Sequence, residues 1–317
     1  MSTISRRGFI SGCVAATMAS AVAESTATGS HDPNLAVFLS DIHCNDKYRG
    51  RWMQHQHAIL RGFVTEILAM RPLPACVVVF GDFSASNGWK EDFLLARELM
   101  KPLVDAGIAM TYGMGNHDKR RNFLEVFPEA ASGLAPVKDR IVSKVALPTC
   151  DLILLDSLRE KPGDAGNFVD GRVDGEQLEW LKAELATAKR PIVLGAHHSA
   201  VEAGLRKLVV TAPTVCGYVY GHEHMWADAY LHDGTYGNSQ TVQTVTLPSS
   251  GYYGDLGYAV FRTFDDHAEL TLRQSDFFFN KEWKGRPQPQ AWASRVAAHQ
   301  GLKASFFYEK PANFYRG

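Results

Sequence analysis

The stretch LAVFLSDIH, residues 35–43, joins a run of five apolar residues to an aspartate and a histidine. A short apolar run bounded by polar residues is typical of a buried strand, so we predict a strand over residues 35–39. Asp41 and His43 then lie just beyond its carboxyl end. Ligands of open α/β sheets bind outside the carboxyl ends of the strands. The stretch therefore predicts an α/β fold with a ligand site at this strand end.

Four more junctions of the same kind follow along the chain. Apolar runs over residues 77–80, 108–112, 192–194 and 215–220 each precede a polar cluster. These clusters are Gly81-Asp82, Gly115-Asn116-His117-Asp118, His197-His198 and Gly221-His222-Glu223-His224. A lone histidine at a strand end is more often a core or loop residue than a ligand. Five such clusters in order do not fit that interpretation, because burying so many ionisable groups is costly unless a cation compensates for their charge. We predict a metal site, with enough ligands for two ions.

In order, the five clusters match the pattern D-x-H, G-D, G-N-H-[DE], H and G-H-x-H. Over residues 41–224 the chain thus resembles the calcineurin-like metallophosphoesterase superfamily, with smaller matches at Leu154-Leu155-Asp156-Ser157 and Gln177-Leu178-Glu179-Trp180-Leu181. Among its branches, the chain is most similar to the class III cyclic-nucleotide phosphodiesterase-like proteins. The resemblance implies a four-layer α/β/β/α sandwich of two mixed sheets flanked by helices.

A ligand set for two metals follows from the resemblance. One ion would be held by Asp41, His43 and His224, and the other by Asn116, His197 and His222, with Asp82 bridging both. Imidazole and carboxylate ligands suit divalent or trivalent ions such as Fe, Mn or Zn. A carboxylate shared by two cations also offsets their mutual repulsion.

The same resemblance implies the chemistry. A hydroxide bridging the two metals would attack phosphorus, because coordination lowers the pKa of water. His117 would stabilise the transition state or protonate the leaving oxygen. Asp118 would accept a hydrogen bond from its other ring nitrogen and fix the tautomer. We expect a small phosphodiester as substrate, with a phosphomonoester as the alternative.

Three neighbours of the site have two interpretations each. His198 is either a substrate contact or, in place of His197, the true ligand. Arg120, in the basic run 119–121, either binds phosphate or belongs to a solvated helix start. Cys44 either faces the site or is a buried, inert thiol.

At the N-terminus, Ser5-Arg6-Arg7-Gly8-Phe9-Ile10 resembles the twin-arginine export motif, and Ala21-Val22-Ala23 resembles a signal peptidase site. We predict a signal peptide over residues 1–23, and therefore a transient interaction with the twin-arginine translocase. That route exports folded proteins, which suits an enzyme that must bind its metals first. The mature protein would then work in a bacterial periplasm or outside the cell.

The rest of the chain predicts one large domain. Residues 24–34 are expected to form a linker and residues 35–275 the catalytic domain, with helices over 52–70, 89–106 and 175–188. We predict a hairpin over 136–155 and strands over 227–231, 240–247, 257–264 and 268–273. The tail, residues 276–317, is aromatic and basic. We expect it to pack on the domain, with a homodimer contact as the alternative.

The charge balance argues against a stable nucleic-acid partner, because the chain has 33 Lys and Arg residues and 34 Asp and Glu residues, and therefore no excess of basic groups. Two further functions stay open: a phospholipid or sphingomyelin hydrolase whose tail touches membrane, and a catalytically silent binding module. The loops over residues 45–51, 83–90 and 162–174 carry no motif that identifies the substrate.

Overall fold

The computed structural model describes residues 30–46, 54–163, 166–232, 241–252, 254–275 and 299–309, without the side chains of 54–56. The predicted signal peptide lies outside the described residues. So do most of the predicted linker and the tail over residues 276–298 and 310–317.

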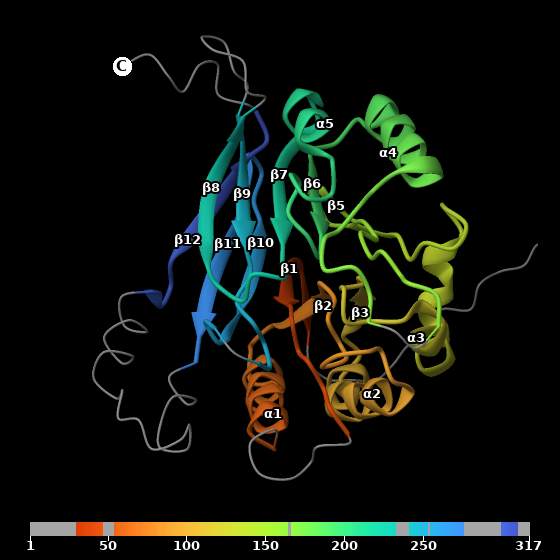
Figure 1. The fold of residues 1–317 in the computed structure, drawn as a ribbon. Coiled ribbons are helices and arrows are strands. Elements are labelled where there is room, and N and C mark those ends of the chain that lie inside the picture. Colours follow the sequence, from red (N-terminus) through yellow and green to blue (C-terminus); the bar gives the residue numbers. More distant parts are fainter. Residues whose placement is uncertain are drawn as a thin grey trace, which may run out of the picture.

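Two six-stranded sheets form the centre of the molecule (Figure 1). The first contains, in spatial order, β12 (Lys303–Phe307), β11 (His267–Gln274), β10 (Gly257–Thr263), β1 (His31–Leu39), β2 (Leu73–Val79) and β3 (Ala109–Tyr112). The second contains β4 (Ser143–Ala146), β5 (Asp151–Leu154), β6 (Ile192–Ala196), β7 (Val215–Tyr220), β9 (Thr241–Thr246) and β8 (Ala227–His232). Each sheet is mixed: β1–β2–β3 and β5–β6–β7–β9 run parallel, and the other neighbours pair antiparallel.

Helices cover the outer face of each sheet (Figure 1). The first is covered by α1 (Gln54–Leu68), α2 (Lys90–Asp105), α3 (Arg120–Val126) and the 3₁₀ turn η1 (Pro128–Leu134), and the second by α4 (Gly175–Thr187) and α5 (Arg206–Thr211). This confirms the predicted α/β/β/α sandwich, and the predicted helices and strands appear within a few residues of their expected bounds. Among the described residues, no helix combines the length and apolar character needed to cross a membrane.

The alternation along β1 shows why the layers stack in this way. Successive strand side chains point to opposite faces of a sheet. Ala36 and Phe38 therefore face the second sheet, whereas Val37 and Leu39 face the helices. All four side chains are fully buried. A strand covered on both faces must be apolar throughout, as this one is.

Two boundaries differ from the prediction. Strand β1 begins at His31, so residues 31–34 belong to the first sheet and the predicted linker was wrong there. The described part of the tail contributes the unpredicted edge strand β12, which pairs with β11. Its Phe306 is fully buried between the sheets, which anchors this part of the tail to the domain.

Candidate metal centre

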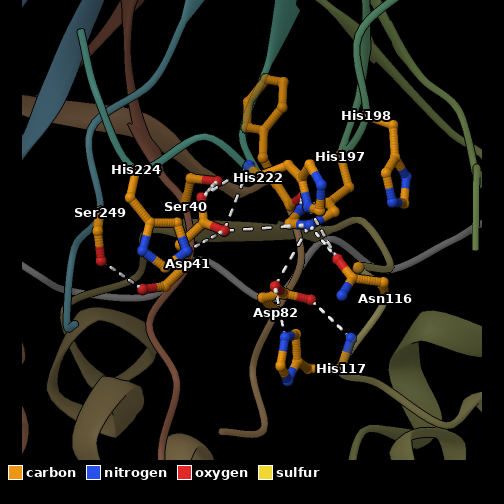
Figure 2. A network of polar contacts seen from close by, with 12 residues as sticks. Ser40, Asp41, Asp82, Asn116, His117, His197, His198, His222, His224 and Ser249 are labelled. Atoms are coloured by element: carbon orange, nitrogen blue, oxygen red, sulfur yellow. Dashed lines mark hydrogen bonds and ion pairs between the residues drawn. The ribbon is translucent and has the colours of Figure 1, made fainter. Parts of the chain in front are cut away.

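The carboxyl ends of five parallel strands, three in the first sheet and two in the second, meet at one edge of the sandwich. Asp41 and His43 follow β1, Asp82 follows β2, and Asn116 and His117 follow β3. From the second sheet, His197 follows β6, and His222 and His224 follow β7. The structure thus brings all seven predicted ligands into one cluster. Figure 2 labels these residues except His43.

The backbone at five of these residues is left-handed. The φ angles are 53° at Asp41, 44° at His43, 53° at Asp82, 71° at His222 and 52° at His224. Such angles are uncommon outside glycine and persist where the surroundings enforce them, most often at functional sites. Each of these side chains is therefore aimed by a tight turn directly after its strand.

One group of potential ligands comprises Asp41, His43, Asp82 and His224, whose ligand atoms all lie within 4.8 Å of one another. The Nε2 atoms of His43 and His224 are 3.0 Å apart. His224 Nε2 lies 3.2 Å from Asp41 Oδ1, and His43 Nε2 lies 3.6 Å from Asp82 Oδ2. Nitrogen and carboxylate atoms thus converge on one small volume.

The second group lies on the other side of Asp82. Asn116 Oδ1 is 3.1 Å from His197 Nε2 and 2.9 Å from His222 Nδ1. His197 Nε2 also lies 3.3 Å from Asp82 Oδ2. The other ring nitrogen of His197 donates to the carbonyl of Phe80, which directs Nε2 into the site. Metal-binding histidines are commonly oriented in this manner.

The charges of the buried side chains in this cluster favour a bound cation. Burial alone would raise the pKa of Asp41 and Asp82, but the imidazoles beside them, chiefly His224 and His197 respectively, hold both pKa values well below the ordinary range. Burial opposes protonation of His197, yet Asp82 and Asp41 raise its pKa to about 9. Burial lowers the pKa of His43 to about 3, which leaves that ring neutral. Two buried carboxylates thus stay ionised and require positive charge, which a metal can supply in place of protons.

His117 lies beside this cluster without being part of it. Its backbone N–H donates to Asp82 Oδ1 over 2.8 Å, and its ring Nε2 is 4.0 Å from Asp82 Oδ2. The ring packs edge-on against His43. About 35% of the His117 side chain is exposed, whereas Asp82 is almost fully buried, so His117 can reach a molecule in solution.

The predicted hydrogen bond from His117 to Asp118 was wrong. Asp118 is fully buried and accepts three backbone N–H groups, from Gly115, Phe83 and Ser84. His117 Nδ1 has no hydrogen-bond partner among the described residues. Asp118 therefore joins the turn after β3 to the turn after β2 instead of orienting the imidazole.

The structure describes the surroundings of all three neighbours. His198 Nδ1 accepts from Ser157 Oγ and its Nε2 donates to the Val169 carbonyl. His198 also forms a group of potential ligands with His197 and His222, whose ligand atoms lie within 4.8 Å of one another, so it stays a candidate ligand beside His197. Burial comes first among the causes that lower the pKa of His198 to about 3. The interpretation of Arg120 as part of a solvated helix start was wrong, because only 10% of its side chain is exposed and the carboxylates of Asp156 and Glu160 hold it. Cys44 is a buried thiol whose pKa is raised by burial.

Three contributors to the site carried no signal in the sequence that we used. Ser40 Oγ donates to Asp41 Oδ2 over 2.5 Å, and Ser249 Oγ donates to the Asp41 carbonyl over 2.8 Å (Figure 2). Ser249 is distant in the sequence and belongs to no motif. Tyr252 packs against His43, with the two ring centroids 5.4 Å apart.

Sequence comparison agrees with this geometry. The profile of the calcineurin-like phosphoesterase family matches residues 36–226, more than half of the chain. The chain is 30% identical over 174 residues to a probable cyclic nucleotide phosphodiesterase of Rhodopseudomonas palustris, covering 54% of this chain and 59% of that protein. A probable cyclic nucleotide phosphodiesterase of Synechococcus is 28% identical over 158 residues, which cover 48% of this chain and 55% of that protein. Metallophosphoesterase 1 of Danio rerio is 27% identical over 140 residues, which cover 37% of this chain and 36% of that protein. The chain thus spans less than two thirds of each of these curated relatives.

Solved structures share the fold. A dimetal phosphatase from Danio rerio superposes with a TM-score of 0.63 at 16% identity, covering 88% of this chain and all of that one. A purple acid phosphatase from Lupinus luteus superposes with a TM-score of 0.56 at 14% identity, covering 78% of this chain and 52% of that one. At these identities the likeness extends to the architecture alone.

Proposed function

Because the chain belongs to the calcineurin-like phosphoesterase family, we propose that it is a metal-dependent hydrolase that cleaves phosphodiesters at two metal ions. One observation carries the proposal: two groups of ligand atoms converge on either side of Asp82, with the partly exposed imidazole of His117 beside them. The phosphodiesterase names of the curated relatives support the choice of a diester over a monoester.

Asp41, His43 and His224 would hold one ion, and Asn116, His197 and His222 the other, with Asp82 shared between them. Bound Fe, Mn or Zn would supply Lewis acidity toward the phosphoryl oxygens and lower the pKa of water.

The protein's own residues position the reaction around that centre. Ser40 and the His222 backbone N–H hold the Asp41 carboxylate, which limits its motion. His117 Nε2 would meet the substrate as a hydrogen-bond donor, either to a phosphoryl oxygen or to the leaving oxygen. Nε2 must carry a proton for either task, since each requires a donor.

Hydrolysis of bis-p-nitrophenyl phosphate and p-nitrophenyl phosphate, with Mn²⁺, Zn²⁺ or Fe²⁺ added, tests the proposal. cAMP and cGMP are assayed beside them. We expect faster cleavage of the diester, and a loss on the order of 10²–10⁴-fold in His117→Ala. His232→Ala, which removes an exposed histidine of β8, is the control and should retain full activity. Preference for the monoester would make the protein a phosphatase. Cleavage of lipid head groups alone would support the phospholipase alternative, and inactivity with every metal and substrate would favour a silent binding module.

We also propose export by the twin-arginine route, on the Arg6-Arg7 motif and the alanines at residues 21 and 23. Replacing both arginines by lysine should retain the protein in the cytoplasmic fraction of the producing bacterium. Unchanged recovery from the periplasm or the medium would refute this route.

A further inference from the structure

The loop that leads from β5 to α4 contacts the turn that carries His117. Its two arms are joined by backbone hydrogen bonds, with the Arg172 N–H donating to the Ser157 carbonyl and the Phe168 N–H to the Arg159 carbonyl. Near its tip, the side chain of Asn167 reaches the turn after β3. The sequence had marked residues 162–174 only as a loop without a readable motif.

The amide of Asn167 binds the main chain on both sides of His117. Its Nδ2 donates to the Asn116 carbonyl over 2.9 Å and to the Asp118 carbonyl over 2.6 Å. Both partners are pure acceptors, so the nitrogen of the amide must face them and the oxygen must point away. The two N–H groups of one side chain thus hold the carbonyls of the two residues on either side of His117.

The His117 ring depends on this support, because little else fixes its direction. Its Nδ1 has no hydrogen-bond partner among the described residues, and Asp118 turns its carboxylate to backbone N–H groups instead. Within the described part of the chain, the hydrogen bond that His117 makes runs from its backbone N–H to Asp82. The direction of the ring therefore follows from the conformation of its backbone.

The loop is itself anchored, so Asn167 is held in place relative to the strands. His198 Nε2 donates to the Val169 carbonyl, and Lys119 Nζ donates to the Lys161 carbonyl on the other side of Asn167. Asn167 thus links a fixed loop to the turn that presents the imidazole.

We propose that Asn167 is the positioning residue for His117: it holds the carbonyls of Asn116 and Asp118, and with them the turn that carries His117, so that the ring meets the leaving oxygen. The inference rests on the proposed function, because it assumes that His117 acts on the substrate. A displacement of about 1 Å at a reacting group costs on the order of 10²-fold in rate. Loss of the Asn167 amide should therefore lower kcat and leave KM and metal binding nearly unchanged.

The test measures bis-p-nitrophenyl phosphate hydrolysis by metal-loaded Asn167→Ala beside Asn122→Ala. Asn122 is a matched control, because its Nδ2 also donates to a backbone carbonyl, that of Gly88, over 2.8 Å and away from His117. We expect kcat to fall on the order of 10- to 100-fold in Asn167→Ala alone. Metal content and melting temperature should change no more than in the control. Asn167→Asp, which keeps the shape and loses the donors, should be impaired like Asn167→Ala.

A double-mutant cycle shows whether the effect passes through His117. If Asn167 acts by placing that ring, Asn167→Ala should cost less than about twofold once His117→Ala is present, because the effects of residues that act as a unit do not add. An equal loss in both backgrounds would overturn the inference while leaving the proposed function intact. Full activity of Asn167→Ala in the otherwise unchanged protein would do the same. Full activity of His117→Ala would instead refute the proposed role of His117, and the inference with it.

Discussion

Removing Arg120 should destabilise the domain far more than removing its neighbour Arg121. The Arg120 guanidinium donates from Nε and Nη2 to the two oxygens of Asp156, each over 2.6 Å, and from Nη1 to Glu160 over 2.6 Å. Asp156 is fully buried and only 10% of the Arg120 side chain is exposed, whereas 90% of the Arg121 side chain is exposed. The two arginines are therefore adjacent in the sequence and opposite in environment.

The expected loss of stability follows from the buried Asp156 carboxylate, which would no longer have the guanidinium as its partner. Breaking a buried ion pair by removing one partner costs about 3–5 kcal/mol. Asp156 would still accept the backbone N–H groups of Ile141 and Leu158, which places the cost near the lower end, about 3 kcal/mol. In a domain of this size, that corresponds to a fall in the apparent melting temperature of roughly 6–12 °C. Arg121→Met removes a surface pair and should cost about 0–1 kcal/mol.

The assay is thermal unfolding of metal-loaded Arg120→Met and Arg121→Met, followed by circular dichroism under identical conditions. The KM for the diester at a temperature where both are folded is measured in parallel. We expect the Arg120 variant to melt lower and to keep its KM, since this guanidinium is engaged by carboxylates. Equal melting temperatures of the two variants would refute the stability argument. A large rise in KM in the Arg120 variant alone would show that Arg120 binds phosphate after all.

Gly115→Ala should cost bound metal, because a Cβ there would lie 2.1 Å from Asp82 Oδ1. Metal analysis should show metal affinity reduced by about 10-fold or more. Gly62→Ala is the control, because a Cβ there meets nothing within 4 Å, and it should bind metal normally. Equal metal content in the two variants would contradict the geometry. Burial raises the pKa of Cys76 and Cys150 to about 11 from an ordinary value of 9.0. Folding therefore favours the neutral thiols, and the stability that this linkage contributes is fully present below pH 9 and lost as the pH rises toward 11. Thermal unfolding between pH 8 and 11 should show this loss of stability, and the loss should be smaller in the Cys76→Ala/Cys150→Ala double variant. The native protein should also resist a thiol reagent at pH 8. Rapid labelling of these thiols would contradict their burial.

Much of the fold could be predicted because it is recorded in local patterns. The run over residues 35–39 is apolar on both sides of the strand, which requires cover on both faces of its sheet. The polar cluster directly after each such run predicts that Asp41, Asp82, Asn116 and His197 lie at strand ends. Strand β12 and the start of β1 at His31 escaped prediction, since their pairing partners are remote in the sequence.

The sequence by itself determined the chemistry of the site: which residue types follow which strands, and hence which side chains can bind a cation. The tertiary structure alone decided how those side chains are oriented. It directed Asp118 to three backbone N–H groups instead of His117, and it brought the ring nitrogens of His198 to Ser157 and Val169. It also brought Asn167, 50 residues farther along the chain than His117, to the carbonyls of the residues on either side of that histidine. The physical reason is that a hydrogen-bond partner is selected by distance and direction, which depend on packing between segments that no local pattern connects.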